Sequence, residues 1–261
     1  MVEFISMKPL VPVWKPLGWT PLKTIEEFKK ENFEYENEKI SYAGRLDPMA
    51  EGILLLLVGE ENKNRKRYES LSKKYNAEIV LGITTDSFDA LGIINSIKPS
   101  SIFLKNRLKE VLKKFEGKKN QKYPPFSSKP VKGKPLYFWA KKGRISEVEI
   151  PEKQIEINSL EIEEIENIST SNLYKDAVGK ISKTEGDFRQ KEILKSWKEF
   201  VKKSKTKKFQ SIKIEISCSS GTYIRRLASD IGEELSCGAF ALSIIRTKVG
   251  KYSRKDCVFG I

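Results

Sequence analysis

Short apolar stretches alternate with turn residues along the chain and predict a sheet. Residues 52–58 are almost entirely apolar, which is typical of a strand buried on both faces. Every second residue is apolar from Tyr75 to Ile83 and again from Ile212 to Cys218, so each of these segments is expected to turn one face toward a core. Further extended segments are expected at 11–16, 155–165 and 239–246.

Apolar residues spaced three and four apart predict four helices. Thr20 caps the first helix, which opens with proline; Ser101 caps the second, and Gly117 ends it. The third lies within 191–208, and the fourth follows the turn 219–222. Their apolar stripes are Leu22, Ile25 and Phe28; Leu104, Leu108, Val111, Leu112 and Phe115; Ile193, Trp197, Phe200 and Val201; and Ile224, Leu227, Ile231 and Leu235. Strands and helices mix without regular alternation, so we expect an α+β fold with a central mixed or antiparallel sheet flanked by helices.

Chain length and local composition bear on the domain organisation. A chain of 261 residues is long enough to bury a sizeable core, and we interpret residues 1–261 as a single domain. Between residues 167 and 208 the composition shifts to serine, lysine and other charged residues, which indicates a basic insertion within that domain. Cys218, Cys237 and Cys257 are too widely spaced for a metal-binding pair and are expected to be small core residues.

The charge balance points to a polyanionic partner. Lysine and arginine together number 49 against 35 aspartates and glutamates, a net charge of +14. Such a surface attracts nucleic acid, although a lysine-rich surface that is merely well solvated is the alternative. The longest apolar run is too short to cross a bilayer, and no targeting segment is recognisable, so a soluble cytoplasmic protein without a membrane partner is expected.

The sequence contains no histidine, which removes Ser/His and Cys/His nucleophile pairs and most zinc or non-haem iron sites. Asp47 is the strongest remaining candidate for chemistry. Gly44 permits backbone angles that are closed to other residues, Pro48 fixes the angle just after the acid, and the strand at 52–58 anchors the segment. This pattern predicts a single carboxylate displayed in a rigid loop; an ordinary Asp-Pro turn is the alternative.

A second candidate lies at the junction between the strand ending at Cys218 and the helix that follows. The first side chains of such a helix project toward the sheet edge, where Arg225 can meet Asp47. A guanidinium beside a carboxylate keeps it ionised and fixes its orientation, as a nucleophile or general base requires. An arginine exposed to solvent or bound to a phosphate is the alternative.

These two segments belong to an ordered set of motifs that resembles the TruB family of tRNA pseudouridine synthases. The set runs from about residue 13 to Tyr252, apart from the insertion at 167–208. Its members are Lys15-Pro-Leu-Gly18, Tyr42-Ala-Gly-Arg-Leu-Asp-Pro-Met-Ala-Glu-Gly52, Gly59-Glu-Glu-Asn-Lys63, Lys74-Tyr75, Thr85-Asp86 with Asp89 and Gly92, Tyr123-Pro-Pro-Phe-Ser-Ser128, Gly133-Lys-Pro-Leu-Tyr137, Ser220-Gly-Thr-Tyr-Ile-Arg225 and Gly232-Glu-Glu-Leu-Ser-Cys-Gly-Ala239.

The resemblance implies the pseudouridine synthase fold and an isomerase that converts uridine to pseudouridine in RNA, with no metal and no organic cofactor. The implied substrate is tRNA, at uridine 55 of the T arm. The implied catalytic residues are Asp47 as the attacking carboxylate, Tyr75 as a ring stacked on the target base and Arg225 as the partner of Asp47; Tyr223 lines the pocket. A base inside RNA must be flipped out before it can be attacked, and an aromatic ring recovers part of the lost stacking. A Tyr75 that faces the core is the alternative.

Other residues are candidates for holding the RNA. Lys15, Lys63 and the basic segment around Lys129, Lys132 and Lys134 are candidates for phosphate contacts, although a single such lysine is more often an ordinary solvated one. Tyr42 stands where the family commonly has a histidine and can still stack against a displaced nucleotide. Arg45 makes the tetrad Gly-Arg-Leu-Asp, which is closer to the RluA and RsuA branches that modify ribosomal RNA.

Substrate and accessory elements therefore stay open at this point. Ribosomal or another structured RNA is one alternative substrate, and a non-catalytic RNA chaperone of the same fold is an alternative from another functional class. The chain stops soon after Tyr252, so the C-terminal PUA module of typical bacterial relatives is expected to be absent, and a monomer is expected. The lysine-rich helix at 191–208 is either an accessory RNA clamp or a plain amphipathic surface helix.

Overall fold

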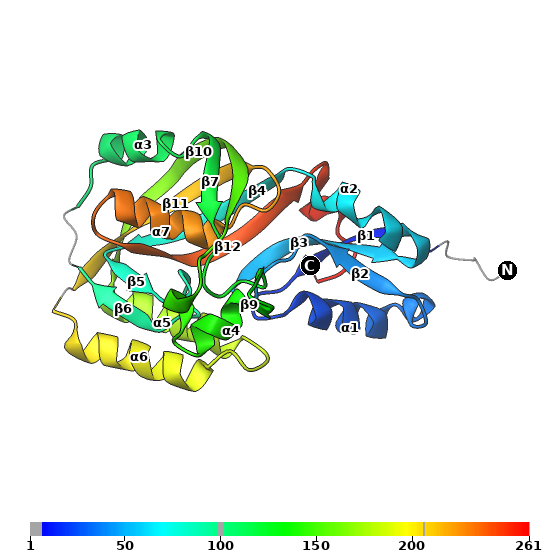
Figure 1. Ribbon diagram of the computed structural model, residues 1–261, viewed down its shortest axis with the longest axis horizontal. Helices are drawn as coiled ribbons and strands as arrows, with labels where there is room; N and C mark the ends of the chain where they lie inside the picture. The colour runs from blue at the N-terminus through cyan, green and yellow to red at the C-terminus, as the bar shows by residue number, and fades with distance from the viewer. Residues whose placement is uncertain (1–6, 99–101, 206, 261) are drawn as a thin grey trace.

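One large mixed sheet organises the molecule in the computed structural model, which describes residues 7–98, 102–205 and 207–260 (Figure 1). Within these residues the sheet has nine strands in the order β1-β3-β12-β4-β11-β10-β7, with β2 added to β3 and β13 to β12. Its strands are β1 (Leu10–Lys15), β2 (Ile40–Ala43), β3 (Ala50–Val58), β4 (Lys73–Leu81), β7 (Gly117–Lys122), β10 (Glu152–Ser169), β11 (Lys208–Cys218), β12 (Ala239–Val249) and β13 (Tyr252–Ser253). The α+β class expected from the sequence is confirmed.

Helices and short hairpins complete the fold. The helices are α1 (Pro21–Glu31), α2 (Arg65–Glu69), α3 (Lys105–Lys113), α4 (Leu136–Lys141), α5 (Thr170–Ser182), α6 (Gln190–Lys203) and α7 (Ile224–Glu234). Two hairpins lie outside the large sheet, β5 (Ile83–Thr85) with β6 (Ile94–Ile97) and β8 (Pro130–Val131) with β9 (Lys134–Pro135). Short 3-10 helices are η1 (Phe33–Tyr35), η2 (Gly59–Asn64), η3 (Ile145–Glu147) and η4 (Arg254–Asp256).

Successive side chains of a strand point to opposite faces of the sheet, and different helices cover the two faces. On β12, Ala239 and Ala241 pack into the cluster covered by α3 and α7, whereas Phe240 and Leu242 pack into the cluster that contains α5 and α6. Figure 1 shows α7 and α3 on one side of the sheet and α5 and α6 on the other. The two large cores are therefore separated by the sheet itself.

The strand pair β3–β12 joins the two halves seen in Figure 1, one built on β1, β2 and α1 and the other on β4, β7, β10 and β11. This pair is parallel and short, and it matches Ala50 with Ile244 and Gly52 with Arg246. The loop that carries Asp47 enters β3 directly at this junction. The candidate nucleophile therefore sits where the two halves meet.

Most predicted elements are present, but some residues at the ends of the predicted helices are not buried as expected. Thr20 caps α1 by accepting from the backbone of Lys23, as expected. Leu22 and Leu104 were expected on buried stripes, but they are 63% and 77% exposed, because Leu22 lies in the first turn of α1 and Leu104 lies just before α3. Val201 is exposed as well. The expected cap Ser101 lies outside the described residues.

Two further segments differ from the expectation. Gly82 interrupts the strand predicted at 75–83 with a φ of +91°, so Ile83 turns into the α5–α6 cluster instead of sharing a face with Ile79. The segment 167–208 holds two helices instead of one, because α5 precedes α6. Their buried side chains include Leu173, Ala177, Ile181, Ile193, Trp197 and Phe200. The predicted insertion is thus part of a core in the described structure.

The remaining sequence expectations concern cysteines and membranes. Cys218, Cys237 and Cys257 are free and buried, as predicted for small core residues. Among the described residues, no helix combines the length and the apolar composition needed to span a bilayer.

Candidate active site

The loop between β2 and β3, residues 44–49, presents Asp47 at the surface of a cavity and is called the Asp47 loop. Gly44 has a φ of +76°, which allows the tight turn before the acid. The backbone is pinned on both sides of the acid, because Ala50 N donates to Asp47 O (3.0 Å) and Gly18 N donates to Pro48 O (2.8 Å). The Asp47 side chain is 29% exposed, so its carboxylate is fixed yet accessible.

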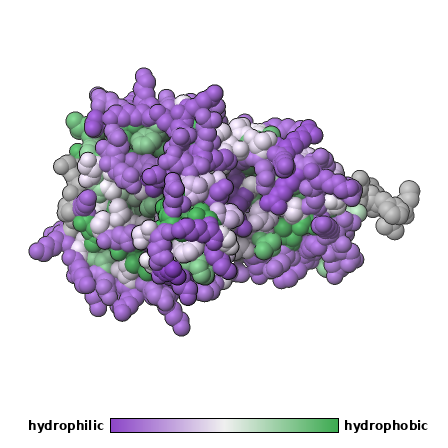
Figure 2. Space-filling model, in the orientation of Figure 1, coloured by the Kyte–Doolittle hydropathy of each residue, from purple (hydrophilic) through white to green (hydrophobic). Residues whose placement is uncertain are grey.

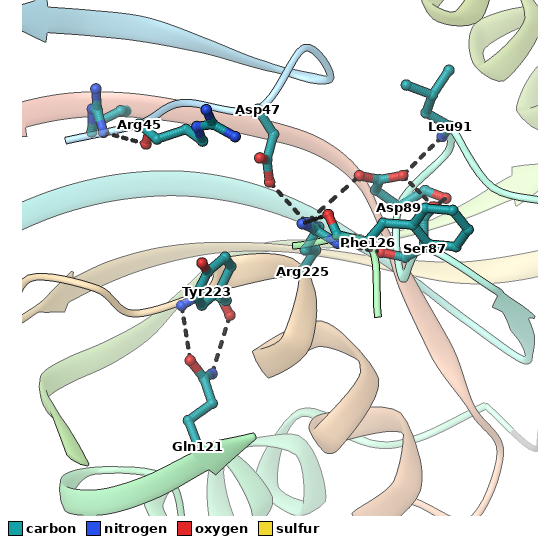
Figure 3. A network of polar contacts seen from close by, with 10 residues as sticks. Arg45, Asp47, Ser87, Asp89, Leu91, Gln121, Phe126, Tyr223 and Arg225 are labelled. Carbon is teal, nitrogen blue, oxygen red and sulfur yellow. Dashed lines mark hydrogen bonds and ion pairs between the residues drawn. The ribbon is translucent and has the colours of Figure 1, made fainter. Parts of the chain in front are cut away.

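Arg225, at the start of α7, contacts that carboxylate directly. Its Nε donates to Asp47 Oδ2 over 2.8 Å, while Nη1 donates to Ser87 O (3.0 Å) and Nη2 to Phe126 O (2.9 Å). Burial lowers the pKa of Arg225, but the carboxylates of Asp47 and Asp89 more than offset it, so the pKa is raised overall. The expectation that Arg225 meets Asp47 is confirmed. Figure 3 shows Asp47 and Asp89 approaching the guanidinium from two sides.

A cavity of about 440 Å³ opens beside this pair. Five of the residues predicted from the sequence line it together, Arg45, Asp47, Tyr75, Tyr223 and Arg225. This volume is within the range of small-molecule and cofactor sites. Figure 2 shows hydrophilic residues over most of this side of the molecule, with hydrophobic residues in several separate patches.

The sequence left open whether Tyr75 faces the core or the site, and in the structure it contacts both. It is 7% exposed and belongs to the large core cluster, yet it also lines the cavity. Burial raises the pKa of its hydroxyl, so the ring is held neutral. The arrangement leaves an aromatic ring at the edge of the core, beside Asp47.

Tyr223 is fixed from behind by a side chain that the sequence did not single out. Gln121 on β7 donates to Tyr223 O (3.1 Å) and accepts from Tyr223 N (2.8 Å), so the backbone at the start of α7 is clamped. Burial and the charge of Asp47 raise the pKa of Tyr223 to about 12, which keeps its hydroxyl protonated at neutral pH.

A second, more apolar cavity of about 330 Å³ shares Asp47, Tyr223 and Arg225 with the first one. Tyr42 and Arg45 line it, together with Phe126 and Phe188. Arg45 Nη2 approaches the Tyr42 hydroxyl at 3.4 Å. Asp47 therefore lines both cavities.

Three of the lysines predicted as phosphate contacts have different surroundings. Lys15 is fully buried and donates to Pro16 O (2.9 Å) and Trp19 O (2.8 Å), so its ammonium group faces backbone carbonyls and not the surface where a phosphate contact was predicted. Burial lowers the pKa of Lys15 to about 7, against the opposing pull of Asp47. Lys63 is exposed and pairs with Glu60. Lys129 lies 5.3 Å from the centre of the Tyr123 ring, which itself lines the larger cavity.

Two buried charges at the site were not among the predicted site residues. Arg246 on β12 is 1% exposed and donates to Ile53 O (2.7 Å), Gly44 O (3.1 Å) and Arg45 O (3.3 Å), so it holds the Asp47 loop to the sheet. Asp89 is 5% exposed, and its Oδ2 lies 4.0 Å from Arg225 Nε. Burial raises the pKa of Asp89 to about 6 in spite of the nearby arginine. Asp89 belongs to a quoted motif, but nothing in the sequence marked Arg246.

Comparison with known proteins places this geometry in a family. Two solved structures share the fold, a Cbf5-Nop10-Gar1 complex (TM-score 0.59, 18% identity) and an H/ACA RNP bound to a substrate RNA containing 2′-deoxyuridine (TM-score 0.57, 17% identity). Each match covers 96% of this chain, which spans about half the length of those chains, 51% and 50% respectively. At this identity the likeness shows the fold alone.

Sequence relatives are closer. A "tRNA pseudouridine synthase B" of Bacteroides thetaiotaomicron is 32% identical over 247 residues, which are 94% of this chain and 86% of that protein. The protein of the same name from Listeria welshimeri is 31% identical over 252 residues, covering 96% of this chain and 69% of that protein. Residues 30–176 match the N-terminal domain of TruB family pseudouridylate synthase. The chain therefore belongs to the TruB family of pseudouridylate synthases.

Proposed function

We propose that this chain converts a uridine of tRNA to pseudouridine, at position 55 of the T arm, with Asp47 as the attacking carboxylate. The observation that carries the proposal is the contact between Asp47 and Arg225 at the wall of a ring-sized cavity. The relatives named as tRNA pseudouridine synthases support tRNA as the substrate class.

The reaction exchanges one bond for another and needs no net oxidant, reductant or added atom. Attack by the Asp47 carboxylate, at C6 of the base or at C1′ of the ribose, allows the bond between N1 and C1′ to break. The base then rotates, C5 bonds to C1′, and the bond to Asp47 breaks and releases the carboxylate. The proton on C5 leaves while N1 gains one. Nucleophilic catalysis by a carboxylate divides this change into two smaller steps.

The other residues would prepare this attack. Arg225 holds the carboxylate in one orientation through a charge-assisted hydrogen bond, which lowers the entropic part of the barrier. Tyr75 would stack on the flipped base, and Tyr223 would close the pocket wall beside it. No organic cofactor has a role in this scheme.

Residues around the two cavities would hold the rest of the RNA. Tyr42 and Arg45 line the apolar cavity, where a displaced neighbouring base would fit. Lys63 and Lys129 would contact phosphates, which position the RNA without reading its sequence. We further propose that residues 1–261 act as one catalytic domain and as a monomer, with 167–208 as a basic insertion in it.

The direct test is incubation of the protein with a T-arm stem-loop transcript, followed by chemical labelling of pseudouridine. The wild-type protein should modify the single uridine that corresponds to position 55. Asp47→Asn should abolish the modification while leaving RNA affinity within a few fold, because phosphate contacts elsewhere dominate binding. A collapse of affinity together with activity would show that Asp47 organises the fold instead.

The same experiment separates the alternatives that the sequence left open. Mapping of pseudouridine in total RNA, from cells with and without the gene, distinguishes tRNA from ribosomal or other structured RNA. Tight binding of the stem-loop without any modification by the wild-type protein would favour a non-catalytic RNA chaperone.

A further inference from the structure

The segment that connects α5 to α6, residues 183–189, reaches the active site and is called the α5–α6 connection. It supports the Asp47 loop through Gly18. Glu185 N donates to Gly18 O (3.1 Å), and Gly18 N in turn donates to Pro48 O next to Asp47. The approach is close enough that a Cβ at Gly18 would lie 2.0 Å from Lys183 O. The α5–α6 connection therefore packs against the segment before α1, and that segment in turn contacts the Asp47 loop.

Arg189 ends this connection and turns its side chain into the site. Its backbone is left-handed, with a φ of +64°, an uncommon conformation for a residue with a side chain. Its Nη1 and Nη2 donate to Asp86 Oδ2 (2.8 Å) and Oδ1 (3.3 Å), and its guanidinium lies 4.2 Å from the centre of the Phe126 ring. The side chain is 19% exposed. One guanidinium therefore ties together two segments that are distant in sequence.

Those two segments hold Arg225 from either side. The carbonyl of Ser87, next to Asp86, accepts from Arg225 Nη1, and the carbonyl of Phe126 accepts from Nη2. Figure 3 shows both carbonyls meeting the same guanidinium that bonds Asp47. A shift of either segment would rotate Arg225 and with it the carboxylate, because the three bonds share one planar fork.

We propose that Arg189 is a positioning residue for the reaction, which acts on Asp47 through Asp86, Phe126 and Arg225. This inference rests on the proposed function, because it deepens the account of the same site. It assigns to the α5–α6 connection a part in catalysis that the family resemblance does not contain. Arg189 lines a small cavity of about 80 Å³ together with Asp47 and Arg225, so direct contact with the RNA is the rival role that a test must separate.

The test uses single-turnover modification of the T-arm stem-loop, which measures chemistry apart from product release. Arg189→Ala should lower the rate constant by about 10- to 100-fold, the size expected from a small misplacement of a catalytic group. The dissociation constant for the stem-loop should stay within twofold. Glu185→Ala is the matched control, because its side chain lies on the same connection, is half exposed and pairs with Lys23 at 3.6 Å, away from Arg225; its rate should equal that of the wild type.

A second variant keeps the test informative if Arg189→Ala folds poorly. Asp86→Asn removes the charge of the partner but keeps the oxygen that accepts from Ile93 N. It should lower the rate to a similar extent. The double variant should be no slower than the slower single one, because both substitutions break the same tether. Additive losses would show that the two residues act separately and would overturn the inference.

Other outcomes overturn it as well. A wild-type rate for Arg189→Ala would show that Arg225 needs no such brace. A weakened dissociation constant with an unchanged rate constant would make Arg189 an RNA contact. Neither outcome affects the proposed function, which fails only if the wild-type protein itself leaves the stem-loop unmodified.

Discussion

Gly52 on β3 and Arg246 on β12 lie side by side in the parallel pair that joins the two halves of the molecule. A Cβ at Gly52 would sit 2.3 Å from Arg246 O, and Gly52 has a φ of +118°. The close approach brings the Arg246 side chain onto the carbonyls of Gly44 and Arg45 in the Asp47 loop. The absence of a side chain at Gly52 therefore allows the sheet to fix the position of the Asp47 loop.

Gly52→Ala should destabilise the protein by about 3 kcal/mol or more, because alanine is strained at this φ and its methyl group meets backbone that cannot move aside. Urea denaturation followed by circular dichroism measures the loss. Gly179→Ala is the matched control, since Gly179 lies in α5 without a positive φ, and a methyl group there would point into open space. At that position the substitution should stabilise by about 0.5–1 kcal/mol through helix propensity. Equal effects at both glycines would contradict the packing argument.

Local patterns were sufficient to predict six of the nine strands in the large sheet and four of the seven described helices, and to place Asp47 and Arg225 at the ends of such elements. Asp47 lies just before a buried strand, and Arg225 lies at the start of an amphipathic helix. The period of each element is plain in the sequence, so the place of both residues at a sheet edge is predictable. The contact itself joins residues 178 positions apart, and it was inferred from the chemistry of the pair. Periodicity along the sequence therefore predicted the elements that carry the two residues, and side-chain chemistry predicted their contact.

The errors arise where a charged side chain is buried against backbone carbonyls. Lysine is rarely buried without partners, so Lys15 was read as a surface residue; two carbonyls of its own chain segment make its burial possible. Arg246 was missed for the same reason, because its three acceptors come from the segment 44–53, about 200 residues away. Such contacts depend on the pairing of β3 with β12, which no local pattern reveals.

Arg225→Lys should lower the turnover number by about 100-fold, equivalent to about 3 kcal/mol of transition-state stabilisation. An ammonium group cannot reproduce a planar fork that reaches Asp47, Ser87 O and Phe126 O at once. Arg226→Lys is a matched control on the same helix, because the ion pairs of Arg226 are with Asp230 and Glu233 of α7 itself. Its turnover should stay within twofold of wild type. Unimpaired turnover in Arg225→Lys would remove the proposed pair from the mechanism.

Lys15→Met should leave the RNA dissociation constant and its salt dependence unchanged, because a buried lysine releases no counterions on binding. Lys129→Ala should reduce the slope of log K against log salt by about 0.7–0.9, the size of one lost phosphate contact. Titrations at several salt concentrations with a fluorescent stem-loop measure both variants. A reduced slope for Lys15→Met would mean that the segment around it opens on binding RNA and would restore the expectation from the sequence.

Stability should depend on pH through Asp89. Burial raises the pKa of this carboxyl from 3.8 to about 6, so between these values the folded state binds more protons than the unfolded state. Asp89 therefore contributes its stability below about pH 4, and that contribution is lost as the pH rises through 6. Relative to Asp89→Asn, the wild-type protein should gain roughly 3 kcal/mol in free energy of unfolding between pH 7 and pH 4.

Asp256→Asn provides a control of opposite sign for this measurement. Hydrogen bonds from the backbone and side chain of Ser253 lower the pKa of Asp256, so the stability that it contributes is lost as the pH falls. Urea unfolding curves at pH 4, 5.5 and 7 measure the free energy of unfolding of all three proteins. As the pH falls, the value for the wild type should approach that of Asp256→Asn and should rise relative to that of Asp89→Asn. If the wild-type and Asp89→Asn stabilities instead changed with pH in parallel, Asp89 would carry the same charge in the folded and unfolded states, and burial would not shift its pKa.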